Sequence, residues 1–290
     1  MTGGGTDETP RLDALLPPEM ARRAEEIGVK KVSMDALGTL ALAVLAGAFI
    51  ALGGVFATTA LAGAGTAPWG VLRVLAGVVF SLGLILVIVG GAELFTGNNL
   101  IVMAWASGRV ATRALLRNWA IVFGGNVLGA TATAAMVCLG GTQHFGGGAF
   151  GITALGIAHA KLELGFGQAV ALGILGNALV CLAVWLSYSA RTTADRVLAI
   201  VPPISAFVAA GFEHSVANMY FVPLGLLIAA LDPGFVASHQ LGPHAQALTW
   251  SGFVLRNLLP VTIGNVIGGA LLVGAVYWFV YLRPRSGGVP

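Results

Sequence analysis

The sequence contains little charge. Only 9% of its 290 residues are Asp, Glu, Lys or Arg, whereas a soluble domain averages about 25%. Hydrophobic residues make up 57%, and the mean hydropathy is +0.89. A globule of this composition could not cover its surface with polar groups. The composition therefore excludes a soluble enzyme, a nucleic-acid-binding module and a disordered linker, and it predicts an all-α membrane protein.

Cysteine and the short catalytic motifs are also scarce. The two cysteines, Cys138 and Cys181, lie within apolar stretches, which favours packing over a disulfide. The sequence has no Walker-type phosphate loop, HExxH zinc helix, GxSxG elbow or CxxC pair. Too few ligand residues occur together to hold a metal ion. We therefore expect no metal site, no cofactor and no enzyme activity.

Cations are few and unevenly distributed. Twelve of the 15 Lys and Arg residues fall in an N-terminal arm at 1–33, connections at 104–117 and 189–196, and a tail at 283–290. Basic residues in alternate connections follow the positive-inside rule. We therefore expect both termini to be cytoplasmic and the protein to lie in the cytoplasmic membrane. The arm lacks a signal-peptide core, and Glu19–Gly28 within it predicts an amphipathic helix on the membrane surface.

Six apolar segments are long enough to cross a bilayer, which takes about 20 residues each. They predict a transmembrane domain over 34–282, with spans at about 34–62, 70–90 continuing to 107, 111–141, 163–188, 197–230 and 249–282. Polar residues interrupt the second span at AELFTGNN (92–99) and the fifth at GFEHSVAN (211–218). We expect each half of a broken span to be too short to cross alone. Backbone at such a break must be buried in protein or line a cavity.

The two halves of the chain are related by an internal repeat. Glu93 and Asn98 in the second span recur 120 positions later as Glu213 and Asn218. In the following span, four residues recur 139 positions later: Asn118, Gly125, Asn126 and Gly129 as Asn257, Gly264, Asn265 and Gly268. Because three spans is an odd number, the halves form inverted three-helix repeats, which predicts a permeation site near the midplane. We expect Asn98 and Asn218 to brace the breaks, and the glycine pairs to allow close helix approach.

His214 is the one histidine at predicted membrane depth. It lies at the break of the fifth span, beside Glu213 and four residues before Asn218. An ionisable residue at this depth is costly to bury, which favours a functional role over a core histidine bonded to backbone. Leu94 occupies the equivalent place in the first half. Asn177 interrupts the apolar fourth span and needs a hydrogen-bond partner, for which His214 is a candidate.

Three other ionisable residues have two interpretations each. Glu93 and Glu213 either accept N–H groups freed by their own helix breaks, which we prefer, or carry protons. Lys161 lies in the extracellular connection before the fourth span. It is either a solvated loop lysine paired with Glu163 or a positive charge that concentrates anions at an outer vestibule.

Three stretches resemble the formate/nitrite transporter family: ELFTGNN at 93–99, NALVCLAVWLSYSARTTADR at 177–196 and FVAAGFEHSVANM at 207–219. The resemblance extends over about 15–283. It implies a homopentamer of aquaporin-like protomers, each with its own pore for small monovalent anions. Formate is the first candidate, and nitrite or hydrosulfide are alternatives.

The resemblance also implies roles for individual residues. His214 would be the central pore histidine, Asn177 and Thr96 its hydrogen-bonding neighbours, and Lys161 the lysine of the outer vestibule. A cytoplasmic constriction would be formed by Leu84, Leu94 and Val180, and an extracellular one by Phe80, Phe95 and Phe207.

These residues suggest two mechanisms. A bare anion is costly to place between apolar constrictions, whereas its neutral acid is not, so protonation assisted by His214 would ease passage. Alternatively, a cationic His214 would stabilise the anion in passing. The competing functions are a channel for small neutral solutes, an intramembrane enzyme using Glu213 and His214 as acid and base, and a membrane scaffold.

Overall fold

The computed structural model describes residues 14–63, 65 and 67–284. These residues form helices joined by short connections, and no strand occurs among them. The prediction of an all-α membrane protein is confirmed. Residues 1–13 of the predicted arm and 285–290 of the predicted tail lie outside the described residues.

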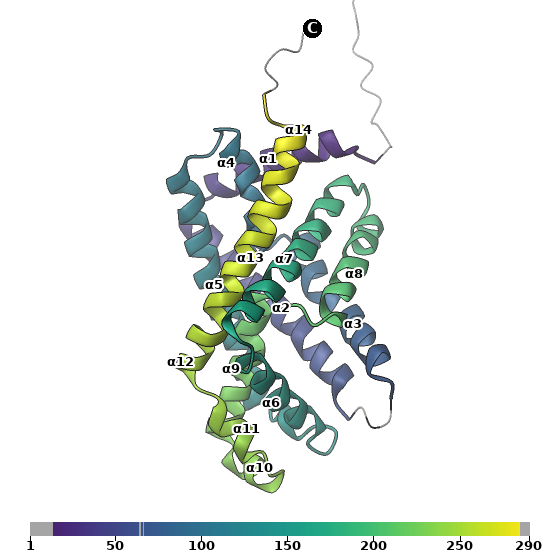
Figure 1. The fold of residues 1–290 in the computed structure, drawn as a ribbon, viewed down its shortest axis with the longest axis vertical. Helices are drawn as coiled ribbons and strands as arrows, with labels where there is room; N and C mark the ends of the chain where they lie inside the picture. Colours follow the sequence, from purple (N-terminus) through teal and green to yellow (C-terminus); the bar gives the residue numbers. More distant parts are fainter. Residues whose placement is uncertain (1–13, 64, 66, 285–290) are drawn as a thin grey trace, which may run out of the picture.

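The first half of the chain forms a surface helix and three spans. Its elements are α1 (Pro17–Ser33), α2 (Ala36–Leu61), α3 (Trp69–Gly90), η1 (Gly97–Ile101), α4 (Val102–Ala106) and α5 (Thr112–Leu139). The Asp35 side chain accepts the N–H of Gly38 at 2.9 Å and so caps α2, whose 26 residues include neither proline nor charge. Helix α1 contains the predicted amphipathic segment and lies across one end of the molecule, near α4 and α14 (Figure 1). We call this the α1 end.

The second half repeats this order with additions. Its elements are η2 (Thr142–His144), α6 (Ala149–Leu162), α7 (Phe166–Ser189), α8 (Thr193–Ala209), α9 (Ser215–Leu231), α10 (Pro233–Ser238) and α11 (Gly242–Ala247). A continuous final helix follows, made of α12 (Trp250–Gly252), η3 (Phe253–Leu258), α13 (Leu259–Val266), η4 (Ile267–Ala275) and α14 (Val276–Tyr281). Its segments η3 and η4 are π-helical. Helices α6, α10 and α11 lie at the other end of the molecule, the α10 end (Figure 1).

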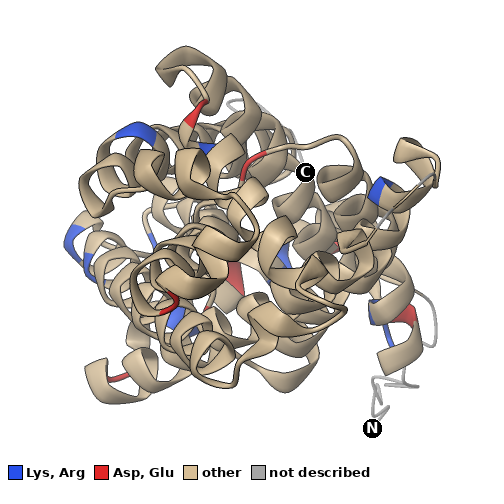
Figure 2. Ribbon diagram, turned by 90° about the horizontal axis from the view of Figure 1, so that it is seen from below, with Lys and Arg blue, Asp and Glu red and all other residues tan. Residues whose placement is uncertain are grey.

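Within the part of the chain that the structure describes, five helices are long and apolar enough to cross a bilayer: α2, α3, α5, α7 and the helix from Trp250 to Tyr281. The predicted fifth span is divided between α8 and α9, of 17 residues each. The expectation that every half of a broken span is short was wrong for α3, whose 22 residues extend about 33 Å. Charged residues occupy only scattered positions along the ribbon (Figure 2).

The connection predicted between the third and fourth spans is largely helical. Helix α6 occupies 14 of its residues and packs against α9. Lys161 is therefore on a helix, and the expectation of a loop lysine was wrong. The last turn of α6 holds the Lys161 side chain against the protein, where it is 15% exposed.

The repeated glycines bring helix backbones together, as predicted. A Cβ atom at Gly129 would overlap the carbonyl of Val44 on α2, and one at Gly268 would overlap the carbonyl of Ile174 on α7. Each glycine thus allows the third span of its half to lie directly against the first. This close approach fixes the frame around the two breaks.

Candidate functional site between two cavities

Both predicted breaks are present, and a glycine with left-handed backbone lies at the start of each. Gly91 follows α3 with a φ of 81°, and Gly211 follows α8 with a φ of 75°. Glycine adopts this conformation without the steric cost that other residues meet. Helical structure resumes at Gly97 in the first half and at Ser215 in the second. The chain between these points is held by side chains of neighbouring helices.

Asn126 of α5 braces the first break. Its Oδ1 accepts the N–H of Phe95 at 2.9 Å, and its Nδ2 donates to the carbonyls of Ala43 (2.8 Å) and Glu93 (3.0 Å). The Asn126 side chain is fully buried. One amide thus ties the broken segment to α2 and satisfies backbone groups that the lost helix turn would otherwise leave unpaired.

Asn265 of α13 braces the second break in the same way. Its Oδ1 accepts the N–H of Ser215 at 2.8 Å, and its Nδ2 donates to the carbonyls of Gly173 (2.8 Å) and Glu213 (3.0 Å). This asparagine and Asn126 are repeat partners, and the same side-chain atoms bond to equivalent backbone groups in the two halves. The sequence repeat marked both residues but did not indicate this role.

The two glutamates at the breaks have side-chain partners. Glu93 accepts from Nζ of Lys31 at 2.6 Å and from Nδ2 of Asn98 at 2.7 Å. Asn98 also donates to Asn118 at 2.9 Å. The preferred expectation, that Glu93 accepts N–H groups freed by its own break, was wrong because Asn126 has that role. The expectation that Asn98 braces the break agrees with these contacts.

The second break repeats this cluster with different residues. Glu213 accepts from Nζ of Lys161 at 2.8 Å and from Nδ2 of Asn218 at 2.6 Å, and Asn218 donates to Asn257 at 2.7 Å. The interpretation of Lys161 as a solvated lysine paired with Glu163 was wrong, since the lysine is bonded to Glu213. The expectation that Glu213 accepts N–H groups of its own break was likewise wrong.

Lys31 was missed as a counterpart of Lys161. The carbonyl of each lysine accepts from the third-span asparagine of its half, Asn118 at 3.4 Å and Asn257 at 3.0 Å. Lys31 and Lys161 are 130 positions apart, as are Leu42 and Leu172, which accept the N–H groups of Glu93 and Glu213. This spacing was the available signal, but Lys31 had been assigned to the topology-setting cations of the arm.

His214 is buried at the N-terminus of α9. Its Nδ1 accepts the N–H of Ala217 at 3.1 Å, so in a neutral ring the proton is on Nε2. Nε2 lies 2.8 Å from Oγ1 of Thr96 in the other break. With Nε2–H donating, the Thr96 hydroxyl hydrogen is left for another acceptor. The two breaks thus meet through the pair that the resemblance implied.

Asn177 does not bond to His214 among the described hydrogen bonds, so this expected contact was wrong. Its Nδ2 donates to the carbonyls of Thr96 (3.3 Å) and Asn265 (2.7 Å) and to Oδ1 of Asn99 (2.9 Å). These contacts connect α7 to the first break, and to the helix whose Asn265 braces the second break. Asn177 therefore positions the backbone of Thr96 and affects the histidine only through it.

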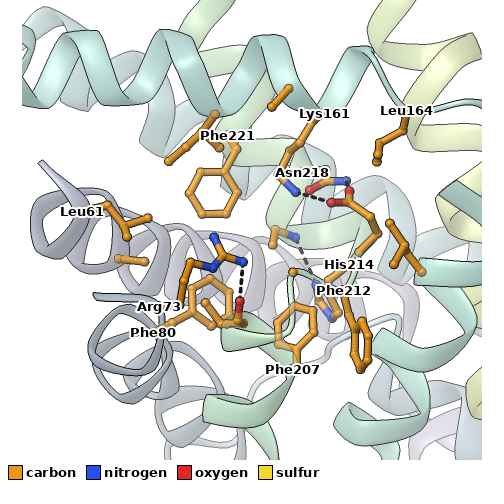
Figure 3. A pocket seen from close by; sticks show the side chains of 18 residues that line it. Leu61, Arg73, Phe80, Lys161, Leu164, Phe207, Phe212, His214, Asn218 and Phe221 are labelled. Atoms are coloured by element: carbon orange, nitrogen blue, oxygen red, sulfur yellow. Dashed lines mark hydrogen bonds and ion pairs between the residues drawn. The ribbon is translucent and has the colours of Figure 1, made fainter. Parts of the chain in front are cut away.

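Two cavities approach the His214–Thr96 pair from opposite ends of the molecule. The Lys161 cavity, at the α10 end, has a volume of about 270 Å³ and is lined by Arg73, Glu213 and His214 besides Lys161 (Figure 3). The Lys31 cavity, at the α1 end, has a volume of about 230 Å³ and is lined by Lys31 and Glu93. Each cavity therefore contains one of the two lysine–glutamate pairs.

The structure divides the predicted constriction residues. Leu84 and Leu94 line the Lys31 cavity, and Phe80 and Phe207 line the Lys161 cavity. The Phe80 and Phe207 rings are 6.0 Å apart, and Phe207 is 5.8 Å from the His214 ring.

The other two predicted constriction residues, Val180 and Phe95, are buried and are not among the described residues lining either cavity. Phe95 packs edge-on against Phe123 and Trp119. Their part in a constriction stays a prediction.

Comparison with known proteins agrees with this architecture. The family model for formate/nitrite transporters matches residues 18–279. The chain is 46% identical over 276 residues to the formate channel FocA of Escherichia coli strain K12, covering 94% of this chain and 97% of that protein. It is 40% identical over 263 residues to FocA of Haemophilus influenzae, covering 90% and 93%.

Among solved structures, a pentameric formate channel with formate bound superposes with a TM-score of 0.80 at 41% identity, covering 86% of this chain and 98% of that one. An ion channel of the FNT family superposes with a TM-score of 0.77 at 27% identity, covering 90% and 98%. The all-helical membrane fold is therefore shared with these proteins.

Proposed function

Because the chain belongs to the formate/nitrite transporter family, we propose that it conducts formate and similar small monovalent anions across a membrane, between the Lys161 and Lys31 cavities and past His214. The observation that carries the proposal is the His214–Thr96 contact between the two cavities. Both cavities are lined by residues of one chain. Each protomer would then have its own pathway.

The polar pair supplies hydrogen bonds where the pathway is otherwise apolar. The carbonyl oxygen of a carboxylic acid at the junction would accept from the Thr96 hydroxyl, which His214 Nε2–H orients by donating to the Thr96 oxygen. Phe80, Phe207 and Leu94 flank this point. An anion without its water is costly between such side chains, whereas a neutral acid is far less so. The solute therefore takes up a proton from water in one cavity, crosses as the acid and releases the proton to water in the other.

The orientation in the membrane follows from the basic connections. Arg109 is ion-paired to Glu25 of α1 at 2.7 Å, which places the α4–α5 connection at the α1 end. The α7–α8 connection reaches the same end, where Ser189 bonds to the carbonyl of Leu15. By the positive-inside rule the α1 end faces the cytoplasm. The Lys31 cavity then opens inward, and the Lys161 cavity opens outward.

Five chains assemble as in the related formate channel, which is pentameric. Large apolar side chains on the outer faces of α2, α3, α5 and the final helix are exposed in the single chain. Lipid and neighbouring protomers together cover such surfaces.

Flux into proteoliposomes tests the function. Purified protein should admit labelled formate and nitrite but should not accelerate swelling in glycerol. Swelling in glycerol without formate uptake would identify a neutral-solute channel and refute the proposal. With the membrane potential clamped, passage as the acid predicts flux that varies little with voltage, whereas a steep anion current would contradict that step.

A further inference from the structure

Arg73 makes the two cavities electrically different. The Lys161 cavity is lined by Arg73, Lys161 and Glu213, so two positive charges and one negative charge leave one net positive charge when His214 is neutral. The charged residues among those lining the Lys31 cavity are Lys31 and Glu93, and their charges sum to zero. In both cavities the lysine is within 2.8 Å of its glutamate, so each pair largely cancels its own field. The uncompensated charge is that of Arg73.

Neutral groups hold the Arg73 guanidinium in place. Its Nη2 donates to the carbonyl of Val208 at 2.5 Å and its Nε to that of Ala209 at 3.3 Å. These carbonyls belong to the last turn of α8, and the carbonyl of Val208 also accepts the N–H of Gly211 at 3.1 Å. Because the partners are carbonyls, the side chain keeps its whole charge. The two bonds use two of five N–H groups and leave three for water or an anion.

Arg73 lies on the route from the cavity to His214. It is seven residues before Phe80, so both side chains are on one face of α3. Phe80 meets Phe207, and Phe207 meets His214. Figure 3 shows the guanidinium beside Phe80, reaching the cavity from a different element than Lys161. An anion in this cavity therefore passes the guanidinium before it reaches the aromatic side chains.

The inverted repeat provides no equivalent cation in the other half. The shift of 120 that relates Gly91 to Gly211 and Glu93 to Glu213 takes Arg73 to Thr193. Thr193 begins α8 and is uncharged. The charge of Arg73 is thus a departure from the symmetry that the two lysine–glutamate pairs follow.

We propose that Arg73 is the anion-binding residue of the Lys161 cavity, and that Lys161 serves with Glu213 to hold the second break. The assignment deepens the function proposed above and rests on it. It differs from the resemblance, which gives the anion-gathering role to Lys161. A fixed guanidinium raises the local concentration of small anions and offers paired N–H donors to a carboxylate.

The test is formate uptake at pH 7 into proteoliposomes, with concentration varied on the Lys161 side. Arg73→Gln should raise the half-saturating concentration about threefold to tenfold while the maximal rate stays within about twofold. Arg73→Lys should recover most of the loss, since it keeps the charge. Arg113→Gln, which removes an exposed arginine at the α1 end, should match the unaltered protein. Added salt should raise the half-saturating formate concentration of the unaltered protein but should leave that of Arg73→Gln unchanged.

The outcomes separate this assignment from the proposed function. If the unaltered protein admits no formate, the proposed function fails. If it admits formate and Arg73→Gln has the same half-saturation and salt dependence, the assignment of Arg73 alone is overturned. Equal losses in Arg73→Lys and Arg73→Gln would also overturn it. Size-exclusion chromatography of each variant checks that it assembles normally.

Discussion

Replacing Asn265 by leucine removes the brace of the break that contains His214. Leucine has the same number and branching of side-chain heavy atoms as asparagine but no hydrogen-bonding group. The change deletes one bond accepted from Ser215 and two donated to Gly173 and Glu213, all at 2.8 to 3.0 Å in a fully buried site. The backbone groups left behind lie away from water.

The expected loss is large. Each deleted hydrogen bond contributes about 1 kcal/mol net, and each buried group left unpaired costs about 1–3 kcal/mol. Three bonds give roughly 3–6 kcal/mol after partial relaxation of the break. The N–H of Ser215 begins α9 directly after His214, so the histidine also loses its fixed position.

Two measurements on Asn265→Leu, with Asn126→Leu as the matched control, test this reasoning. The thermal unfolding temperature in detergent should fall by at least about 5 °C in both variants, because each asparagine makes three equivalent hydrogen bonds to its own break and first span. Formate uptake should fall further in Asn265→Leu than in Asn126→Leu, since the second break contains the histidine. An unfolding temperature within 1 °C of the unaltered protein's would refute the bracing role.

Two further predictions concern charged groups. Lys31→Met leaves Glu93 buried without its cation and should destabilise the protein by about 3–5 kcal/mol, while the double variant with Glu93→Gln should regain most of that in thermal unfolding. Outside the membrane, the Gln143 side-chain amide is the largest cause that lowers the pKa of Asp232. A lowered pKa in the folded state stabilises above the ordinary pKa of aspartate, and this stabilisation is lost as the pH falls through the lowered value. Asp232→Asn should therefore reduce the decline of stability below about pH 4, compared by acid unfolding, and an unchanged acid profile would contradict the assignment.

The spans, breaks and inverted repeat could be predicted because each leaves a local mark. Polar residues such as Glu93 and Glu213 are conspicuous in apolar runs, and their common spacing exposed the repeat. Helix α6 was missed because its 14 residues are fewer than a span needs and lie between two longer apolar segments. Sequence length alone does not distinguish such a helix from a connection.

The partners of buried polar groups could not be predicted in the same way. Asn126 and Asn265 lie in the middle of apolar helices, and nothing near them in sequence needs a hydrogen bond. Their partners come from breaks about 30 and 50 residues away, which packing alone brings close. One of the two interpretations of Lys161 paired it with Glu163, two residues away in sequence, whereas the fold offers Glu213 in the cavity.

Formate uptake by the His214→Asn variant tests the central claim most directly. The claim is that the solute passes between the two cavities at the His214–Thr96 pair. The measurement is the rate of labelled formate uptake into proteoliposomes between pH 5 and pH 8, at equal amounts of assembled protein. A pathway past this pair predicts that the variant loses the rate and pH profile of the unaltered protein. A rate and a pH profile that superpose on those of the unaltered protein would contradict it.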